Sequence, residues 1–407
     1  MEFLTAITSD VALRIIASFP LAERQTVEVP LEAAPDRVLA ADIIAAEDIP
    51  PFSRSLVDGY AVKVKDTYGA RESTPALLVP AGEVRVGEAT EKRMGEGEAV
   101  YVATGAMLPE AADGVVMQEY VRRSADDLEV TRSLRRGENI CFAGEDVRAG
   151  QVVLERGKGL TPFDIGVLAA LGITRVSVYR QPEIGLISSG DEVVPVEEAP
   201  PPGKIRDINT HTVSSLLMDK GCMVRFAGIA RDAVRDVRDK LSMVRESDMI
   251  LLSGGSSKGQ MDFVTTAIEA LGGTVLFHGL NIKPGKPTIF ANLWGKPVFG
   301  LPGHPVSCAM VVLRFVLPLV RRLKGETREE RSHAVRGRLA TNVPSSYGIE
   351  EYVRVTIERA EDLVVVTPIF AKSSVISMLS RADGYFIVPE GKEGLEAGEE
   401  VEVFFFA

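Results

Sequence analysis

The central part of the chain, from about residue 183 to 323, alternates short apolar runs with helical patterns. The runs EIGLIS, VRFAGIA, DMILLS, TVLFH and PVFGL have the length of strands and are almost continuously apolar. Strands that are buried on both faces have this composition. Helical patterns at 212–220, 233–245 and 263–271 lie between the runs. The alternation predicts an α/β domain with a mainly parallel sheet, which we assign to residues 181–325.

The segments on either side of this unit follow other patterns. Short β-branched stretches such as AVYVAT and GVVMQEYV, with glycine and proline between them, predict a β-rich domain over residues 46–141. Thr161 followed by Pro162 predicts the start of a helix that Gly172 should end. Strand patterns and glycine turns in residues 326–407 predict a compact terminal barrel or sandwich.

Composition restricts the class of function. At 407 residues the chain is longer than one hydrophobic core usually organises, so several domains are expected. A formal charge of -11 repels polyanions, which argues against nucleic acid and acidic membranes as partners. The most apolar stretch, Ala309 to Val320, is interrupted by Arg314 and is shorter than the roughly 20 residues that span a bilayer. We therefore expect no membrane segment.

The cysteines and the first residues indicate the compartment. Cys141, Cys222 and Cys308 are far apart and include no CxxC pair, so neither a zinc site nor a disulfide framework is suggested. The opening segment MEFLTAITSDVALRIIASFP resembles an amphipathic helix more than a secretory signal. We expect a reducing, cytoplasmic location.

Unusual residues follow the strands of the central unit. Ligands of open α/β sheets bind beyond the carboxyl ends of the strands, so these loops should converge on one pocket. The loops are SSGDE at 188–192, RD at 231–232, SGGSSKG at 253–259, KPGKP at 283–287 and LPGHPVS at 301–307.

Three of these loops have the properties of anion sites, and each has a simpler alternative. SGGSSKG offers open backbone N–H groups and hydroxyls for a phosphate, but it lacks the Walker and dinucleotide spacings and serves equally as a tight turn. In KPGKP, Lys283 and Lys286 flank a Pro-Gly turn and could face one dianion. The alternative is two unrelated surface lysines, although the prolines favour an ordered loop. LPGHPVS reads either as an anion-facing helix start or as a well-formed helix start alone.

Acidic residues lie on the same predicted rim. Glu192, Asp232 and Asp262 stand beside the phosphate-type loops, where carboxylates commonly hold Mg²⁺ together with substrate phosphate oxygens. Asp232 would serve equally as a helix cap. We expect a hydrogen-bonded structural role for His304 and core packing for Cys308.

Taken together, the motifs resemble the molybdopterin molybdenumtransferase family, the bacterial counterpart of the C-terminal domain of gephyrin. The resemblance spans nearly the whole chain. Eight motifs carry it, in family order: PPFSRSLVDGYAV (50–62), VATGAMLPEAADGVVMQEY (102–120), RRGENICFAGEDVRAGQVV (135–153), SSGDEV, GKIRDINTH, SGGSSKGQMD, KPGKP and LPGHPVS.

The resemblance implies a fold and a reaction. It implies a homodimer with a discontinuous helical linker domain (1–45 and 142–180), the β-rich domain, a pterin-binding α/β domain and a C-terminal β-barrel. Members of the family bind adenylylated molybdopterin, Mg²⁺ and molybdate, release AMP and leave molybdenum on the dithiolene. The substrate supplies the sulfur ligands, so no cysteine cluster is required. Protein partners would be the molybdopterin adenylyltransferase and the molybdoenzymes that accept the product.

Site residues follow from matching motif positions. The resemblance assigns catalysis to Asp58, Thr104, Asp146, Asp262, Lys283 and Lys286. It assigns the metal to Glu192, Asp232 and Asp262. Substrate binding falls to Ser189, Gly190, Gly254, Gly255, Ser256, Gly303, Pro305, Ser307, Arg354, Ser374 and Ser377.

Two other functions compete with this interpretation. An adenylyltransferase that activates the pterin has a similar α/β unit, but such proteins usually consist of that unit alone. A non-catalytic scaffold of the gephyrin type would carry a long Pro/Ser-rich linker, which this sequence lacks.

Overall fold

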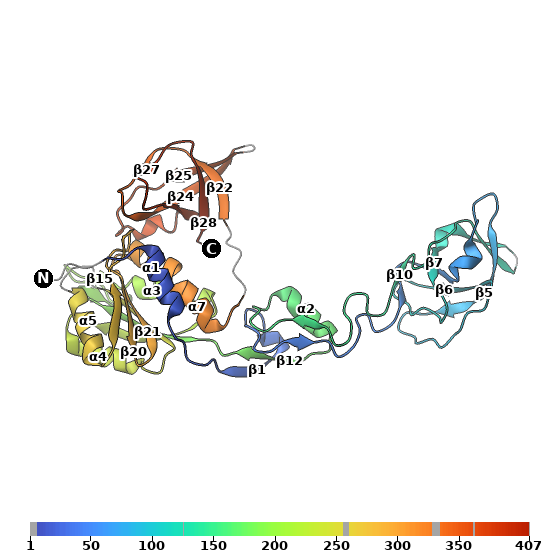
Figure 1. Cartoon of the computed structure of the whole chain (residues 1–407), viewed down its shortest axis with the longest axis horizontal. Coiled ribbons are helices and arrows are strands. Elements are labelled where there is room, and N and C mark those ends of the chain that lie inside the picture. Colours follow the sequence, from blue (N-terminus) through green and yellow to red (C-terminus); the bar gives the residue numbers. More distant parts are fainter. Residues whose placement is uncertain (1–5, 125, 255–259, 328–333, 361–362, 407) are drawn as a thin grey trace.

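The chain forms an elongated molecule of four units. The computed structural model describes residues 6–124, 126–254, 260–327, 334–360 and 363–406. The α/β unit and the C-terminal barrel lie at one end, a slender linker unit in the middle and the β-rich unit at the other end (Figure 1). The multidomain α/β and β architecture expected from the sequence is therefore confirmed.

A twisted sheet organises the α/β unit, and its described strands run in the order β16-β13-β17-β21-β20-β18. The first four are parallel, whereas β20 is antiparallel to both of its neighbours, β21 and the edge strand β18. The mainly parallel sheet was predicted, but β20 was not. Its strands are β13 (Glu183–Ser189), β16 (Met223–Ala230), β17 (Met249–Gly254), β18 (Thr274–His278), β20 (Ile289–Leu293) and β21 (Lys296–Leu301).

The antiparallel direction of β20 follows from a two-residue hairpin. Leu293 pairs with Lys296, so Trp294 and Gly295 alone make the turn. Both have positive φ, 56° and 75°, which is the geometry of the hairpin turn that matches strand twist. The sequence Trp-Gly is not one of the favoured pairs for this turn, which explains why the hairpin was not predicted.

Helices cover both faces of the sheet, and the helical patterns predicted between the strands are confirmed. No helix of the described ranges has the length and apolarity needed to cross a membrane. The helices are α1 (Ser9–Ser18), α3 (Asn209–Asp219), α4 (Val234–Met243), α5 (Gln260–Ala270), α6 (Pro305–Val311) and α7 (Leu317–Lys324), with a π-turn, η4 (Val312–Val316), between the last two.

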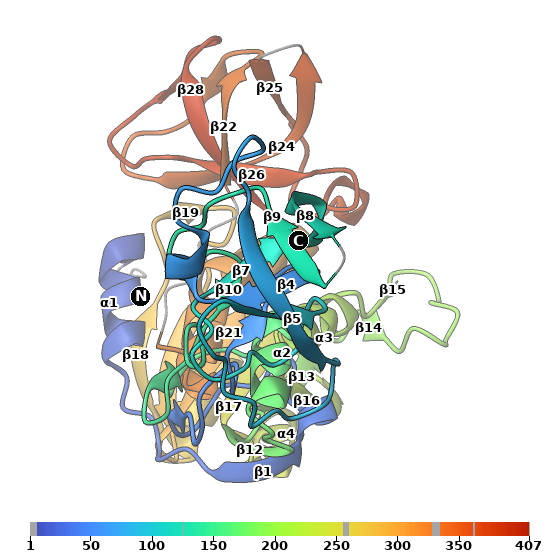
Figure 2. The ribbon, with the colours of Figure 1, turned by 90° about the vertical axis from the view of Figure 1, so that its right-hand side faces the viewer.

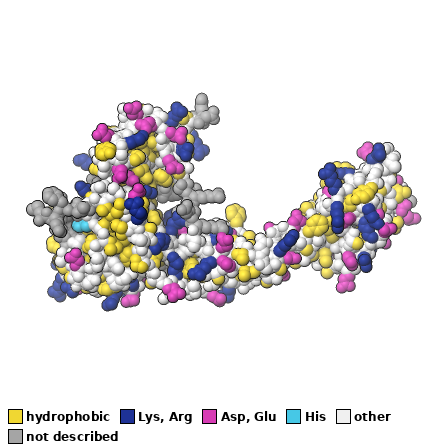
Figure 3. All heavy atoms as spheres, viewed as in Figure 1, with side chains coloured by type: hydrophobic (Ala, Val, Ile, Leu, Met, Phe, Trp, Pro, Cys, Tyr) yellow, Lys and Arg dark blue, Asp and Glu magenta, His cyan; other side chains and the backbone are white. Residues whose placement is uncertain are grey.

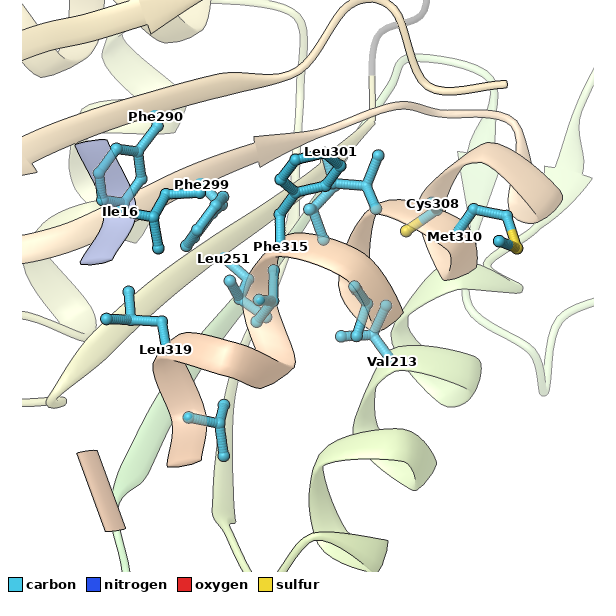
Figure 4. Close-up of a cluster of buried hydrophobic side chains, with 14 of the residues drawn as sticks. Ile16, Val213, Leu251, Phe290, Phe299, Leu301, Cys308, Met310, Phe315 and Leu319 are labelled. Carbon is cyan, nitrogen blue, oxygen red and sulfur yellow. The ribbon is translucent and has the colours of Figure 1, made fainter. Parts of the chain in front are cut away.

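Helix α1 belongs with the α/β core. Figure 4 shows Ile16 beside Phe290 and Phe299 of the sheet, with Phe315 and Leu319 nearby. The sequence grouped residues 1–45 with the linker, whereas this helix packs in the core of the α/β unit. Its apolar face covers the sheet, and burying that face there removes more apolar surface from water than the small linker could offer.

The linker unit contains less helix than expected. Two short strand pairs and α2 (Pro162–Ala170) form it, around a small apolar cluster. The predicted start of α2 is confirmed, because Thr161 and Asp164 form a reciprocal capping box, and the helix stops before Gly172. The other elements are β1 (Thr26–Pro30), η1 (Leu31–Ala33), β2 (Ile43–Ile44), β11 (Val152–Leu154) and β12 (Arg175–Tyr179).

The β-rich unit is a twisted sheet with strand order β7-β4-β6-β5-β9-β8 among its described residues. Its elements are β3 (Arg54–Ser55), β4 (Gly59–Val62), η2 (Val64–Thr67), β5 (Ala76–Val84), β6 (Glu98–Val102), β7 (Gly114–Met117), η3 (Gln118–Tyr120), β8 (Val121–Ser124), β9 (Asp127–Val130) and β10 (Ile140–Cys141).

The C-terminal strands close into a barrel. β24 pairs with both β25 and β26, and β22 and β28 complete the ring. A strand of the α/β unit, β19 (Ile282–Lys283), adds to the outside of β24. The barrel elements are β22 (Ala334–Leu339), β23 (Val343–Pro344), β24 (Glu350–Ala360), β25 (Leu363–Pro368), η5 (Ile376–Met378), β26 (Gly384–Val388), β27 (Gly394–Leu395) and β28 (Glu400–Phe405).

The packing of α1 can be tested by truncating its buried face. Ile16→Ala should lower the unfolding free energy of the α/β unit by about 2–5 kcal/mol, because it opens a cavity in the core. Arg14→Ala, on the exposed face of the same helix, should change it by less than about 0.5 kcal/mol. Trp294, the single tryptophan, reports on this unit during denaturant unfolding. An unchanged Trp294 transition in Ile16→Ala would contradict the assignment.

Candidate functional site

A cavity lies at the carboxyl ends of β13 and β16, the edge of the sheet at which the sequence predicts a pocket. It has a volume of about 950 Å³ and extends beneath an arm formed by β14 (Val193–Val194) and β15 (Ile205–Arg206). Figure 2 shows this arm projecting from the α/β unit. Its charged lining comprises the carboxylates Asp191, Glu197 and Asp207 and the cations Lys204 and Arg231. We call it the substrate pocket.

A second cavity, of about 510 Å³, lies between the linker and α7. Its cations already have anionic partners: Lys158 pairs with Asp164, and Lys324 pairs with Glu326 at 2.7 Å. A phosphate ligand would have to displace these carboxylates, so the substrate pocket is the better candidate.

Two glycines allow the turns beside the substrate pocket to approach each other. Gly254 has a φ of +147°, and a Cβ atom there would lie 1.9 Å from the carbonyl oxygen of Ser189. A Cβ atom on Gly190 would lie 2.8 Å from Oε2 of Glu192, so that carboxylate folds back over its own turn. Ser189, Gly190, Glu192 and Gly254 are thus brought together. Gly255 and Ser256 lie outside the described residues.

Two aspartates face each other at this rim. The backbone N–H of Asp191 donates to Oδ2 of Asp232, and that of Asp232 donates to Oδ1 of Asp191, each at 3.4 Å. Ala233 occupies the N-cap position of α4, so the alternative of Asp232 as the cap residue is wrong. The side chain of Asp262 lies outside the described part of the chain, and its backbone lies in α5.

These acids fit a Mg²⁺ ion for which substrate phosphate oxygens and water supply most of the ligands. Among the described residues, no group of three His, Cys, Asp or Glu side chains is arranged to hold a metal. An all-protein cage is therefore not what this rim supplies. Mg²⁺ is commonly bound by one or two carboxylates plus phosphate oxygens and water, and the adjacent Asp191 and Asp232 match that pattern.

The start of α3 and the residues just before it contribute buried polar side chains that sequence reasoning missed. Oδ1 of Asp207 accepts the backbone N–H of Thr210 at 3.1 Å, and Nδ2 of Asn209 donates to the carbonyl of Gly303 at 2.8 Å. Asp207, Asn209 and Thr210 are each at least nine-tenths buried. They belong to the GKIRDINTH motif, and its polar residues directly before a helix were the signal for a site.

The turn before α6 connects the α/β unit to the barrel. Pro305 occupies the first helical turn, as predicted, and Ser307 is buried. Nδ1 of His304 lies 3.0 Å from Oγ of Ser373, which gives this histidine a structural contact. Burial raises the pKa of the Cys308 thiol to about 12, so this cysteine stays protonated in the core.

The KPGKP segment, here called the oxyanion loop (283–287), is ordered. The carbonyl of Lys286 accepts the backbone N–H of Leu280 at 2.8 Å, and Thr288 Oγ1 donates to the carbonyl of Gly285 at 2.7 Å. Gly285 has a φ of +125°, and a Cβ atom there would lie 2.8 Å from Val311. These constraints favour an ordered loop that fixes both lysines over the alternative of two unrelated surface lysines. Both lysines are exposed.

The oxyanion loop meets charged barrel residues. Nζ of Lys283 lies 2.9 Å from Oε1 of Glu351 on β24. Arg354 is buried and donates to the carbonyls of Tyr352 and Ala371, at 3.0 and 3.2 Å. Its Nε is also buried and has no hydrogen-bond partner among the described residues. Burial lowers the pKa of Arg354, which the charge of Glu351 opposes. Ser374 and Ser377 are exposed residues that follow β25.

The remaining predicted residues lie far from this region in the same chain. Asp58 accepts hydrogen bonds from the backbone N–H and the hydroxyl of Thr104, at 2.7 and 3.0 Å. Both residues belong to the β-rich unit, at the opposite end of the molecule from the α/β unit (Figure 1). Asp146 is exposed, and its backbone donates to Ile49 at 3.1 Å. One chain therefore does not bring these three residues to the substrate pocket.

Comparison with known proteins decides the family. Three family models match: "MoeA N-terminal region (domain I and II)" over 7–172, "Probable molybdopterin binding domain" over 185–322 and "MoeA C-terminal region (domain IV)" over 336–406. The molybdopterin molybdenumtransferase of Bacillus subtilis is 33% identical, over 99% of this chain and 95% of that protein. The chain belongs to the MoeA family. The resemblance drawn from its motifs is thereby confirmed.

Other MoeA relatives agree along the whole chain. The molybdopterin molybdenumtransferase of Haemophilus influenzae is 33% identical and covers 93% of each protein. The crystal structure of the molybdopterin biosynthesis moeA protein from Pyrococcus horikoshii OT3 is 32% identical, with a TM-score of 0.86. It covers 99% of this chain and 100% of that chain. The fold of this MoeA family member is thus the one found in a solved relative.

The Asp58–Thr104 pair predicts a measurable titration. The hydrogen bonds from Thr104, of which the backbone bond is the larger cause, lower the pKa of Asp58 and hold it as a carboxylate. Thr104→Ala should raise that pKa but leave it below the ordinary value, because the backbone bond remains. Any stability from the pair is present above the pKa of the unfolded chain and is lost as the pH falls through the lowered value.

Carboxyl NMR titration of the unaltered protein and Thr104→Ala measures this effect. Thr131→Ala is the matched control, because that hydroxyl donates to the carbonyl of Tyr120 and to no carboxylate. An Asp58 pKa that stays the same in Thr104→Ala would contradict the role of the hydroxyl.

Proposed function

We propose that this MoeA family member is a molybdopterin molybdenumtransferase. It inserts molybdate into adenylylated molybdopterin with Mg²⁺-dependent release of AMP. The names of the Bacillus subtilis and Haemophilus influenzae relatives support the activity. The family model over the α/β unit, described as a molybdopterin binding domain, supports the pterin as ligand.

One observation carries the proposal: contacts connect the substrate pocket to the oxyanion loop without a break. Asn209, beside the pocket, bonds to Gly303, and the neighbouring His304 contacts Ser373. The same barrel segment contains Ala371, whose carbonyl accepts from Arg354. Arg354 lies on β24 with Glu351, which holds Lys283. A pterin in the pocket and an oxyanion at the loop would therefore be held by one connected framework.

The charges of the residues suggest different roles for the oxyanion loop and for the acidic rim of the substrate pocket. Phosphoanhydride cleavage and delivery of a dianion bring several negative charges together, so electrostatic stabilisation is the main contribution available. Lys283 and Lys286 attract molybdate, with Arg354, Ser374 and Ser377 completing its surroundings. Glu192, Asp232 and Asp262 would hold Mg²⁺, which neutralises phosphate charge when bound. The rest of the substrate site is formed by Ser189, Gly190, Gly254, Gly255, Ser256, Gly303, Pro305 and Ser307.

A complete site requires a second chain. Asp58, Thr104 and Asp146 act in catalysis in this proposal, yet the β-rich unit, which contains Asp58 and Thr104, lies at the other end of the molecule (Figure 1). A two-fold dimer can place the β-rich unit of one protomer over the substrate pocket of its partner. We place the reaction in the cytoplasm. The molybdopterin adenylyltransferase would supply its substrate, and molybdoenzymes would receive its product.

Two substitutions separate the metal region from the oxyanion region. Asp262→Asn should keep binding of adenylylated pterin but slow its cleavage by about 100-fold or more, because it removes one preorganised group. Lys286→Ala should instead raise the molybdate concentration at half-maximal rate, because it removes ground-state attraction for the anion. Calorimetric titration and single-turnover cleavage distinguish the two effects.

Two outcomes would refute these assignments. Loss of pterin binding in Lys286→Ala, with unchanged molybdate dependence, would move the loop to the phosphate site. Rapid formation of adenylylated pterin from molybdopterin and ATP would instead identify the chain as the adenylyltransferase.

Mixed dimers test whether two chains share each site. At a molybdate concentration well below that needed by Lys286→Ala, the Asp58→Ala and Lys286→Ala variants are each expected to be weakly active as pure dimers. After random mixing, half of the dimers should contain one intact site, which restores about one quarter of the unaltered activity. The measurement is activity as a function of the ratio of the two variants, with subunit exchange monitored by mass spectrometry. No recovery despite complete exchange would show that each site lies within one chain.

A further inference from the structure

The carboxylate of Glu351 stands at the centre of the oxyanion region, and neither the motifs nor the family comparison assigns it a role. It accepts Lys283 Nζ at 2.9 Å on one oxygen and Ser345 Oγ at 2.8 Å on the other. Arg354 lies close enough on the same strand for its pKa to respond to this charge. The β19–β24 register places Lys283 directly opposite Glu351. Backbone pairing and two side-chain partners thus fix this carboxylate.

Burial prevents Glu351 from acting as an ordinary surface partner of Lys283. Its side chain is 12% exposed, whereas that of Lys283 is 59% exposed. The lysine ammonium has three donors, so it can keep Glu351 on one and offer the others to an anion from solvent. An anion at the loop therefore meets Lys283 directly, and it is repelled through space by the fixed charge behind it.

The net charge of the oxyanion site is equal and opposite to that of one class of ligand. Of the groups assigned to the oxyanion site, Lys283, Lys286 and Arg354 contribute three positive charges and Glu351 one negative charge, which leaves two positive charges. A tetrahedral dianion such as molybdate neutralises that sum.

We propose that Glu351 determines the charge selectivity of the oxyanion site, setting its net charge to match a dianion. This inference rests on the proposed function, because it takes the oxyanion loop as the molybdate site. Without the carboxylate the site carries an excess positive charge. It then binds every oxyanion more tightly, and the gain is larger for ligands of higher charge, because Coulomb energy is proportional to ligand charge.

Glu351→Gln tests the charge while it keeps the shape. The amide oxygen can still accept from Lys283, and the amide NH2 can donate to the Ser345 hydroxyl in place of the second carboxylate oxygen, so the loop stays ordered. The probes are molybdate, a dianion, and perrhenate, a tetrahedral monoanion of similar size, titrated calorimetrically into the full-length protein at constant ionic strength. Affinity should rise about tenfold for molybdate and only about threefold for perrhenate, so that the logarithm of the gain doubles with ligand charge.

Two variants on the same protein control for other effects. Glu358→Gln makes the same change at an exposed position further along β24, and both affinities should stay within about twofold because solvent screens that charge. Ser345→Ala removes the hydrogen bond to Glu351 but keeps its charge, so any shift should be equal for the two anions. The Trp294 unfolding transition verifies that each variant is folded.

Equal gains for both anions in Glu351→Gln, or weaker binding of both, would overturn the proposal and leave Glu351 only as an anchor for Lys283. A two-to-one pattern in Ser345→Ala would also overturn it. If the unaltered protein bound no molybdate, the oxyanion loop itself would be wrongly assigned, which is the failure of the proposed function rather than of the charge argument.

Discussion

One continuous apolar core holds the α/β unit, the first helix and the barrel in place. Phe290 and Phe299 of the sheet, Ile16 of α1 and Tyr352 and Tyr385 of the barrel belong to the same cluster. Burial of this much aromatic and aliphatic surface is the dominant favourable contribution to folding. The positions of the oxyanion loop and the substrate pocket depend on it, because their residues come from elements that meet only through this core.

Hydrogen bonds at the edge of that core align three segments: the residues before α1, the segment 279–281 and the start of β24. Ile7 exchanges backbone hydrogen bonds with Gly279 and Asn281, and Asn281 in turn accepts from Glu350 at the start of β24. Ser9 donates to the Glu350 carboxylate at 2.9 Å. Burial raises the pKa of Tyr352, so its hydroxyl remains a donor to the same carboxylate. Each of these bonds contributes only about 0.5–1.5 kcal/mol, but together they leave one way for the barrel to dock.

Local cations explain how an acidic protein handles anionic substrates. Lys and Arg side chains are interspersed with Asp and Glu over the face shown in Figure 3. The chain as a whole, with a formal charge of -11, offers no general attraction for polyanions. In the proposed function, anion binding therefore depends on fixed groups at short range, such as Lys283 and the buried Arg354. The proposed selectivity follows from the same arrangement, because Glu351 holds Lys283 and backbone carbonyls hold Arg354.

The sequence by itself determined the α/β unit, the start of α2 at Thr161 and the loops that follow the strands, because periodicity and capping are properties of neighbouring residues. It also determined the family, through motifs read in order. Only the tertiary structure decided that α1 covers the sheet, that Trp294 and Gly295 turn β20 antiparallel, and that Glu351 faces Lys283. These features depend on pairings between segments far apart in the chain, whose free energy is set by burial and register rather than by any local pattern.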